Sequence, residues 1–89
     1  MIICRVVGHV WATKKEPSLE GLKLMIVEEE AGMDSFVAAD VVGAGIGERV
    51  LVVAGSTARR ALGRDECAAD CAIVGIIDSL EVDRERIQK

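Results

Sequence analysis

The 89-residue chain has almost no aromatic side chains and an excess of negative charge. Trp11 and Phe36 are its only Phe, Tyr or Trp residues. Proteins that bind single-stranded nucleic acid stack bases on aromatic rings, and phosphate contacts in general require Lys and Arg. The formal net charge of -4 and the isoelectric point of about 4.9 oppose such contacts. The composition therefore argues against a nucleic-acid partner.

Long apolar runs are also missing, and so is a secretory signal. No stretch of the chain approaches the ~20 consecutive apolar residues that a membrane-spanning helix needs. Residues Met1–Arg5 lack the basic region, long apolar core and cleavage site of a signal peptide. We therefore expect no membrane partner and a cytoplasmic location.

The sequence lacks the residue combinations that mark an enzyme. His9 is the single histidine, and no partner motif accompanies it, so we interpret it as structural. The segment Gly55–Arg59 reads G-S-T-A-R rather than the G-x-S-x-G of a hydrolase nucleophile elbow. The carboxylates at 28–30 indicate a solvated turn, because three consecutive side chains cannot point the same way in a strand. We expect no catalytic activity and no cofactor.

The three cysteines are odd in number for a disulfide framework and too few for a metal site. Cys67 and Cys71 are four residues apart, a spacing that suits two ligands on a helix. Structural zinc takes four ligands, and only Cys4 and His9 remain to complete the set. We therefore predict free, buried or half-buried thiols and no bound metal.

Apolar residues, by contrast, are abundant and mostly small. They make up 51% of the chain, and the mean hydropathy is +0.31. A chain of this length forms one domain, here residues 1–89, and buries only about 60–65% of the surface that its unfolded state exposes. It carries more apolar surface than one small core can cover. This surplus predicts a subunit interface.

Five apolar stretches predict β-strands. Alternation marks the first, and a continuous apolar run, expected to be covered on both faces, marks the fourth. Glycines at 8 and 75 predict bends of the kind that close a sheet into a barrel. The predicted fold is all-β, a small closed five-stranded barrel, although periodicity alone does not separate a barrel from a sandwich. The stretches are residues 2–13, 21–28, 36–42, 49–54 and 71–78.

One short helix is predicted after the fourth strand. Ser56 or Thr57 is its expected N-cap, and the helix runs through Leu62 to a stop at Gly63. Residues 79–89 carry charges of alternating sign and fit a tail, a strand or a second short helix equally well.

Individual side chains within these strands carry further expectations. Leu22, Leu24 and Ile26 share one face of the second strand. Asp40 is the one charge of the third strand and needs hydrogen-bond partners, either the amides of the following loop or an arginine. Trp11 is interpreted as a packing anchor, a role that large amphipathic rings fill at interfaces.

The connection between the third and fourth strands carries glycines at alternate positions, Gly43, Gly45 and Gly47. A dinucleotide-binding loop is disfavoured, because Glu48 replaces its last glycine and a strand follows instead of a helix N-terminus. The favoured interpretation is a tight connection in which glycine supplies positive φ or close backbone approach. A small-ligand or nucleotide-binding barrel that uses the loop at 43–48 stands as the alternative.

Three blocks of the sequence resemble one known family. Residues 38–51 read A-A-D-V-V-G-A-G-I-G-E-R-V-L, residues 55–59 read G-S-T-A-R, and residues 70–78 read D-C-A-I-V-G-I-I-D. Together with V-V-G-H-V-W-A-T-K at 6–14 and L-E-G-L-K-L at 19–24, they are similar to the EutN/CcmL family over nearly the whole chain. Thr57 stands where that family more often has serine.

This resemblance implies a fold and a role. Members of the family are OB-like five-stranded barrels that assemble as homopentamers around a narrow axial opening. They form the vertices at the fivefold corners of bacterial microcompartment shells, whose other tiles are hexameric. The resemblance thus implies a structural protein with two kinds of partner, further copies of itself and the hexameric shell proteins of the same microcompartment.

One region is the candidate subunit interface or axial opening. Its loop has too little side-chain volume to build a core, and its charges suit pairing between subunits, although simple solvation at a turn is an alternative. Gly45→Val is expected to weaken the pentamer if backbones meet there or if φ is positive. The predicted site residues are Gly43, Ala44, Gly45, Ile46, Gly47, Glu48, Arg49, Ser56 and Arg59.

We expect the three cysteines neither to bind zinc stoichiometrically nor to form a disulfide on which assembly depends, because the ligand set is incomplete. Elemental analysis of the purified protein should find far less than one zinc per chain, and reduction should leave the assembly state unchanged. About one zinc per chain, or dissociation on reduction, would contradict this prediction.

Overall fold

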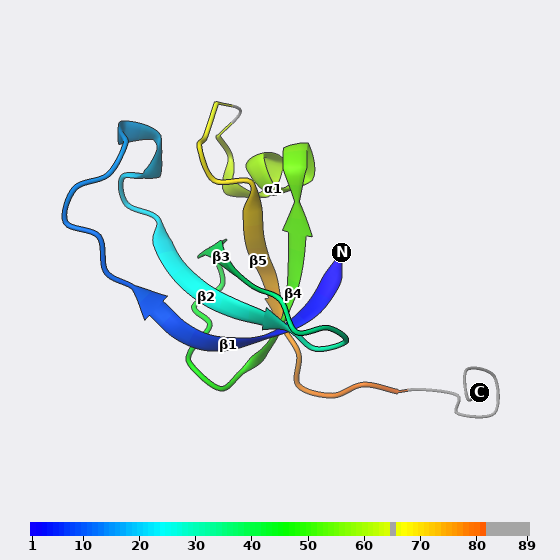
Figure 1. The fold of residues 1–89 in the computed structure, drawn as a ribbon. Helices are drawn as coiled ribbons and strands as arrows, with labels where there is room; N and C mark the ends of the chain where they lie inside the picture. The colour runs from blue at the N-terminus through cyan, green and yellow to red at the C-terminus, as the bar shows by residue number, and fades with distance from the viewer. Residues whose placement is uncertain (65, 82–89) are drawn as a thin grey trace.

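The computed structural model describes residues 1–64 and 66–81, and within them five strands close into a barrel (Figure 1). The strands follow one another around the barrel in the order β1-β2-β3-β5-β4. Neighbours are antiparallel except β3 and β5, which run parallel over a short contact. The predicted closed five-stranded barrel with one short helix is confirmed. The elements are β1 (Ile2–Val10), a 3-10 helix η1 (Pro17–Leu19), β2 (Lys23–Glu29), β3 (Ser35–Asp40), β4 (Arg49–Ala54), α1 (Gly55–Leu62) and β5 (Cys71–Ile76).

The barrel interior is filled by alternate side chains of each strand. Val6 of β1 lies opposite Val27 of β2, which in turn lies opposite Phe36 of β3. Small and β-branched residues dominate, as suits the narrow interior of a barrel of few strands. The buried core consists of Cys4, Val6, Met25, Val27, Ala38, Ala44, Val50, Val52 and Ile73.

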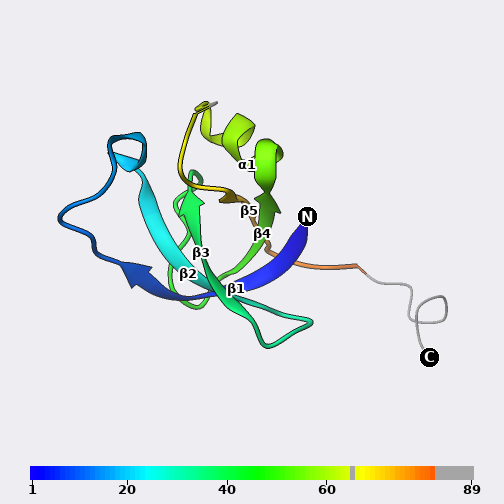
Figure 2. The same ribbon diagram turned by 45° about the horizontal axis from the view of Figure 1, so that its top comes forward.

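Helix α1 packs against β4 and β5 at one end of the barrel (Figure 2). Ala58 of the helix forms a second buried cluster with Val53 and Ala72. Val52 belongs to the barrel core and Val53 to this second cluster, so this part of β4 is covered on both faces, as its apolar run predicted. The helix has eight residues, and no helix in the described part of the chain has the length and apolar character to cross a membrane.

Two bulges bend the strands where the sequence predicts it. In the pairing of β1 with β2, Val7 is an extra residue between paired positions Val6 and Gly8. In the pairing of β4 with β5, Val74 is skipped next to Gly75. A Cβ added to Gly8 would lie 3.1 Å from the Cδ1 atom of Ile26, so the strands approach closely there. Bulges increase local twist and help a small sheet to close.

Most strand ends differ by a few residues from the prediction. β1 ends at Val10 rather than at residue 13, because its pairing with β2 stops there. β2 begins at Lys23 rather than at residue 21, since Gly21 has a φ of 78°, outside the strand region. β3 ends at Asp40, two residues early, and β5 likewise stops before residue 78. β4 matches the prediction at both ends.

The even-numbered residues of β2, which the sequence predicts to form one apolar face, do not fill the barrel interior. Met25 and Val27 are buried in the core, whereas Leu24 and Ile26 are only half-buried and belong to the outward row. Both rows of this strand are apolar, so its outward row adds to the apolar surface of the subunit.

Helix α1 begins earlier than predicted, and no side chain caps it. Its N-cap is Ala54, so the predicted capping by Ser56 or Thr57 is wrong. Gly55, with a φ of 66°, turns the chain directly from β4 into the helix, which leaves no residue between the two elements for a capping side chain. At the other end Gly63 is the C-cap, as predicted, with a φ of 71°.

The connection from β1 to β2, residues 11–22, projects from the barrel and is named here the β1–β2 arm (Figure 1). Ser18 ties its tip to the loop that follows α1. The Ser18 carbonyl accepts hydrogen bonds from Arg64 Nη1 at 2.7 Å and Cys67 Sγ at 3.4 Å, and its hydroxyl accepts from the Ala68 amide at 2.9 Å. The Glu16 carboxylate accepts from the Ser18 amide at 2.9 Å and caps η1. These contacts hold the arm in place.

Candidate functional site

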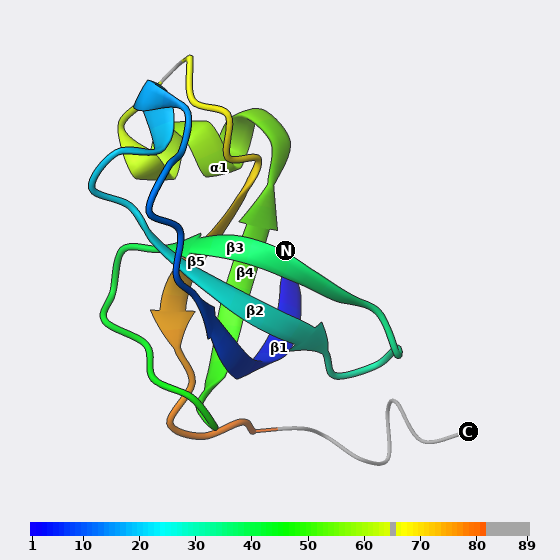
Figure 3. The same cartoon turned by 60° about the vertical axis from the view of Figure 1, so that its left-hand side comes forward.

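The loop between β3 and β4, residues 41–48, leads from the end of β3 to the start of β4 (Figure 3). It contains six of the nine predicted site residues, and Arg49 begins the strand that follows. The remaining two, Ser56 and Arg59, lie in α1 at the far end of β4. The structure therefore divides the predicted site into two places, separated by the length of one strand.

The first half of this loop is anchored by the buried carboxylate of Asp40. Its Oδ1 atom accepts from the Val42 amide at 3.0 Å, and its Oδ2 atom accepts from the Ala44 amide at 2.8 Å. Lys23 Nζ lies 3.3 Å from Oδ2 and also donates to the Ala44 carbonyl at 2.8 Å. The prediction that Asp40 binds loop amides is confirmed, while its cationic partner is a lysine rather than an arginine.

This anchor places Ala44 in the barrel core, where it is completely buried. The loop therefore contributes one small side chain to the core, although its side-chain volume is too small to build one. Its amide donates to the Asp40 side chain and its carbonyl accepts from the Lys23 side chain, and these two hydrogen bonds hold Ala44 inward. Ile46, two residues on, is by contrast 67% exposed.

The second half of the loop is joined to β1. The Gly47 amide donates to the Val6 carbonyl at 2.8 Å, and the Val6 amide donates to the Glu48 carbonyl at 2.9 Å. Arg5 Nη1 donates to the Gly47 carbonyl at 2.7 Å. Glu48 also closes a tight turn, because its Oε1 atom accepts from the Gly45 amide at 2.6 Å. The loop is thus held to β1 at its end and to β2 at its beginning.

The three glycines of the loop serve different needs. Gly43 and Gly47 have φ values of 81° and 93°, in the region that favours glycine, and no atom lies within 4 Å of a Cβ added at either. Gly45 has no positive φ, and a Cβ added there would lie 3.4 Å from Glu48 Oε1. Of the two alternatives that the sequence suggested, positive φ therefore applies to the outer two glycines and does not apply to Gly45.

A phosphate bound by this loop would accept hydrogen bonds from its backbone amides, but these amides already donate to side chains of the same subunit. Asp40 occupies the amides of Val42 and Ala44, and Glu48 occupies that of Gly45. Both acceptors are carboxylates, which would repel a bound anion. This arrangement disfavours the alternative of a nucleotide-binding loop.

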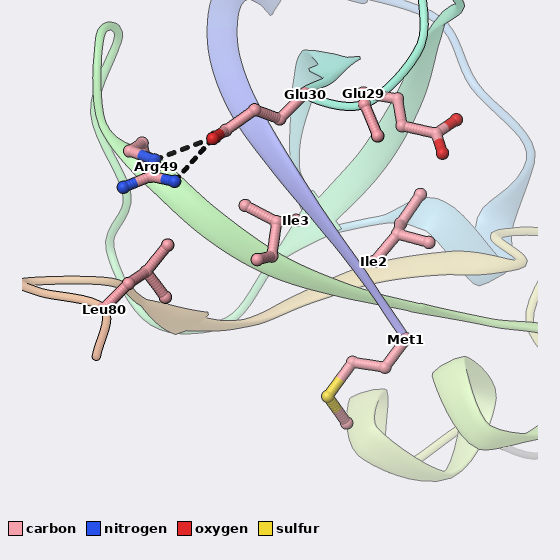
Figure 4. Close-up of a pocket in the computed structure, with 8 residues that line it drawn as sticks. Met1, Ile2, Ile3, Glu29, Glu30, Arg49 and Leu80 are labelled. Atoms are coloured by element: carbon pink, nitrogen blue, oxygen red, sulfur yellow. Dashed lines mark hydrogen bonds and ion pairs between the residues drawn. The ribbon is translucent and has the colours of Figure 1, made fainter. Parts of the chain in front are cut away.

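The Arg49 guanidinium forms a bidentate ion pair with Glu30, at 2.8 Å from Nε to Oε2 and 2.5 Å from Nη2 to Oε1 (Figure 4). These hydrogen bonds from Arg49 lower the pKa of Glu30. The pair borders a hollow of about 330 Å³, whose apolar lining includes Ile2, Ile3 and Leu80. Pairing of the loop charges across a subunit seam stays a prediction.

The cysteines do not share a helix. Cys67 lies in the loop after α1, and Cys71 begins β5, so the spacing expected for two helical ligands does not apply. Burial raises the pKa of the Cys4 thiol, and the neighbouring Glu29 carboxylate raises it further. Burial likewise raises the pKa of the Cys71 thiol, with a further increase from the Asp70 carboxylate. Among residues 1–64 and 66–81, no three His, Cys, Asp or Glu side chains form a group that could hold a metal ion.

Sequence reasoning missed the role of Lys23. Lys23 of β2 lies directly opposite Asp40 of β3 in the pairing of the two strands. This register brings the two opposite charges together at the end of the sheet. A lone lysine at the start of one apolar strand and a lone aspartate at the end of the next is the signal that could have found it. The signal becomes readable only with the register of the two strands.

Comparison with known proteins gives a consistent result. The family model described as "Ethanolamine utilisation protein EutN/carboxysome" matches residues 1–78. The carboxysome shell vertex protein CcmL of Synechococcus elongatus is 42% identical over 92 aligned positions, covering 98% of this chain and 93% of that protein. The solved structure of Gloeobacter violaceus CcmL is 43% identical with a TM-score of 0.84, covering 93% of this chain and 91% of that one. The GrpN pentameric microcompartment shell protein from Rhodospirillum rubrum is 39% identical with a TM-score of 0.80, covering 93% of this chain and 100% of that one.

Substitution of the loop glycines tests their separate needs. Gly43→Ala and Gly47→Ala should each lower the free energy of unfolding by about 1–2 kcal/mol, because an L side chain is strained at positive φ. Gly45→Ala, the matched control in the same loop, should cost less. Urea unfolding followed by circular dichroism measures all three, and equal losses would show that backbone conformation is not the reason for the outer glycines.

Removal of the loop anchor should be more damaging. Asp40→Ala leaves two amides and the Lys23 ammonium without their acceptor, and we expect a loss of about 2–4 kcal/mol in the free energy of unfolding. Asp34→Ala, at an exposed position in the β2–β3 turn, is the control and should change it by less than about 0.5 kcal/mol. Similar losses for the two variants in chemical unfolding would rule out the anchoring role.

Proposed function

Because the chain belongs to the EutN/CcmL family, we propose that it is a structural protein that forms pentameric vertices in the shell of a bacterial microcompartment. This proposal rests on one observation: the fold of this chain matches that of a pentameric shell protein over almost the entire length of both chains. Relatives from carboxysomes and from other microcompartments are named shell vertex proteins, so the role is common to several kinds of shell.

The surface of the subunit suits association with further copies. Several apolar side chains outside the core are at least one third exposed, on the outer face of the barrel and along the 41–48 loop. Burying such side chains between subunits stabilises an assembly by about 25 cal/mol for each Å² removed from water. The exposed residues of this kind include Val7, Val37, Val41, Val42 and Ile46.

A closed barrel is a suitable block for a rigid vertex. Each strand is paired on both sides, so copies meet through side chains rather than by adding strands to a free edge. In the proposed role residues 1–89 act as one domain, the pentamer fills a fivefold corner, and hexameric shell proteins of the same microcompartment surround it. The family's role is structural, and the proposal assigns no catalytic step to any residue of this chain.

The candidate contact residues remain part of the proposal. Residues 43–49 lie at one end of β4, with Ile46 directed outward, and Ser56 and Arg59 lie at the other end. We therefore propose two separate contact regions rather than one, the loop against a neighbouring subunit and the start of α1 elsewhere in the ring. Gly45→Val remains a test of the first region through close backbone approach alone, since Gly45 has no positive φ.

The assembly state tests the proposed function directly. Native mass spectrometry and light scattering coupled to gel filtration should find a homopentamer at micromolar concentration, with little folded monomer, because a single subunit would expose its apolar contact surface. Added nucleotide should not change the mass. A monomer, or a species that gains the mass of a nucleotide, would reject the vertex role in favour of a ligand-binding barrel.

A further inference from the structure

The β1–β2 arm, residues 11–22, places no side chain in the hydrophobic core. None of its residues is buried, and Trp11, its largest side chain, is 83% exposed and stacks on the ring of His9 with centroids 3.9 Å apart. The arm also lies outside the sheet, since the pairing of β1 with β2 ends at Val10 and Leu24. Segments with few buried apolar contacts open at a low cost in free energy. The position of the arm therefore depends on its polar contacts.

These polar contacts meet at Ser18, at the tip of the arm beside α1 (Figure 3). Within the arm, the Glu16 carboxylate accepts hydrogen bonds from the amide and the hydroxyl of Ser18. From the loop after α1, Arg64 Nη1 and Cys67 Sγ donate to the Ser18 carbonyl at 2.7 Å and 3.4 Å, and the Ala68 amide donates to the Ser18 hydroxyl at 2.9 Å. We name these residues the Ser18 latch.

The latch is the polar link between the arm and the rest of the chain. Among residues 1–64 and 66–81, every side-chain hydrogen bond between the arm and another segment involves Ser18. Lys15 Nζ donates to the Leu22 carbonyl at 3.4 Å, but both residues belong to the arm. Arg64 reinforces the link, because Nη2 of its guanidinium lies 3.8 Å from the position of a Cβ added at Gly21. Breaking the latch would therefore release the arm and leave the barrel core and its strand pairing in place.

We propose that the β1–β2 arm is a strap with two positions, closed on the loop after α1 through the Ser18 latch and open, and that it opens without unfolding of the barrel. Arg64 and Cys67 are positioning residues in this device, because both donate to the Ser18 carbonyl. The strap gives the end of the barrel that carries α1 two surface shapes. The proposal goes beyond the vertex role and does not depend on it.

Cys67 reports the state of the latch. It is only 8% exposed, and its Sγ atom both donates to Ser18 and accepts from the Ala69 amide at 3.4 Å, so it is shielded while the latch is closed. Cys4 is an internal reference, because it is completely buried in the barrel core and becomes accessible when the barrel unfolds. Iodoacetamide labels either thiolate: the sulfur bonds to the methylene carbon of the reagent, iodide leaves, and the thiol proton passes to the buffer.

The first test compares the two thiols in the native full-length chain. Mass spectrometry follows labelling of the two cysteine-containing peptides, and each rate is divided by that of the same thiol in the urea-unfolded chain. On this scale Cys67 should react at least about 10-fold faster than Cys4, because local opening costs less than global unfolding. Low concentrations of urea should accelerate labelling of Cys4 and leave that of Cys67 nearly constant, since opening of the arm exposes little new surface.

A core variant separates opening of the strap from unfolding of the barrel. Val27→Ala removes apolar contacts from the barrel core, where Val27 is completely buried, and leaves the latch intact. It should raise the labelling rate of Cys4 several-fold and leave that of Cys67 unchanged.

Latch variants test the role of Ser18. Ser18→Ala should raise the labelling rate of Cys67 by about 5-fold to 30-fold, the change expected when one or two hydrogen bonds are lost. Ser35→Ala is the matched control, because Ser35 is exposed at the start of β3, and it should leave this rate unchanged. Circular dichroism should show the same barrel in both variants, since neither serine belongs to the core.

A second latch variant guards against an effect peculiar to the serine. Arg64→Ala should also raise the labelling rate of Cys67, because it removes the other donor to the Ser18 carbonyl. Arg60→Ala, at an exposed position in the last turn of α1, is its matched control and should have no effect.

Each contrary outcome would overturn the strap. Equal normalised rates or equal urea dependence for the two thiols, or equal acceleration of both in Val27→Ala, would show that Cys67 becomes accessible through unfolding of the barrel. An unchanged Cys67 rate in Ser18→Ala or in Arg64→Ala would show that the latch does not control access. Native mass spectrometry reads the assembly state separately, so absence of the pentamer would reject the proposed function and not the strap.

Discussion

The buried carboxylate of Asp40 is the interaction on which the rest of the structure depends. Asp40 is paired with Lys23 of β2 on one side and with Ile73 of β5 on the other, so it lies at the junction that closes the barrel. A buried charge is costly unless it is paired and hydrogen-bonded, and two loop amides and an ammonium group meet that need. The same bonds bring Ala44 into the core and direct the loop toward β4.

Closure of the barrel explains why association must use side chains. Bulges at Val7 and Val74 curve the strands until every edge is paired, so no free edge remains among the described strands for another chain to extend. The narrow interior accepts mostly small residues, and the outward rows keep part of the apolar surplus. Further exposed apolar side chains lie in the β1–β2 arm, which directly precedes Lys23 in the chain, and in the 41–48 loop, which directly follows Asp40.

The predicted cap of α1 was wrong for a tertiary reason. Capping of α1 by Ser56 or Thr57 fits local preferences, yet the positive φ of Gly55 takes the chain directly from strand to helix. The path of the chain out of β4 thus overrides a capping preference that is worth about 1 kcal/mol.

The sequence by itself determined the strands, the bends at Gly8 and Gly75, the helix stop at Gly63 and the membership of a family, because alternation, glycine content and motif blocks are local properties of the chain. Only the tertiary structure decided which row of β2 fills the barrel, that Lys23 is the partner of Asp40, and that the predicted site divides into residues 43–49 and the start of α1. These features depend on the register between strands that are far apart in sequence. A shift of one residue in that register would turn every side chain of a strand to its other face, and the pattern within a single strand cannot specify it.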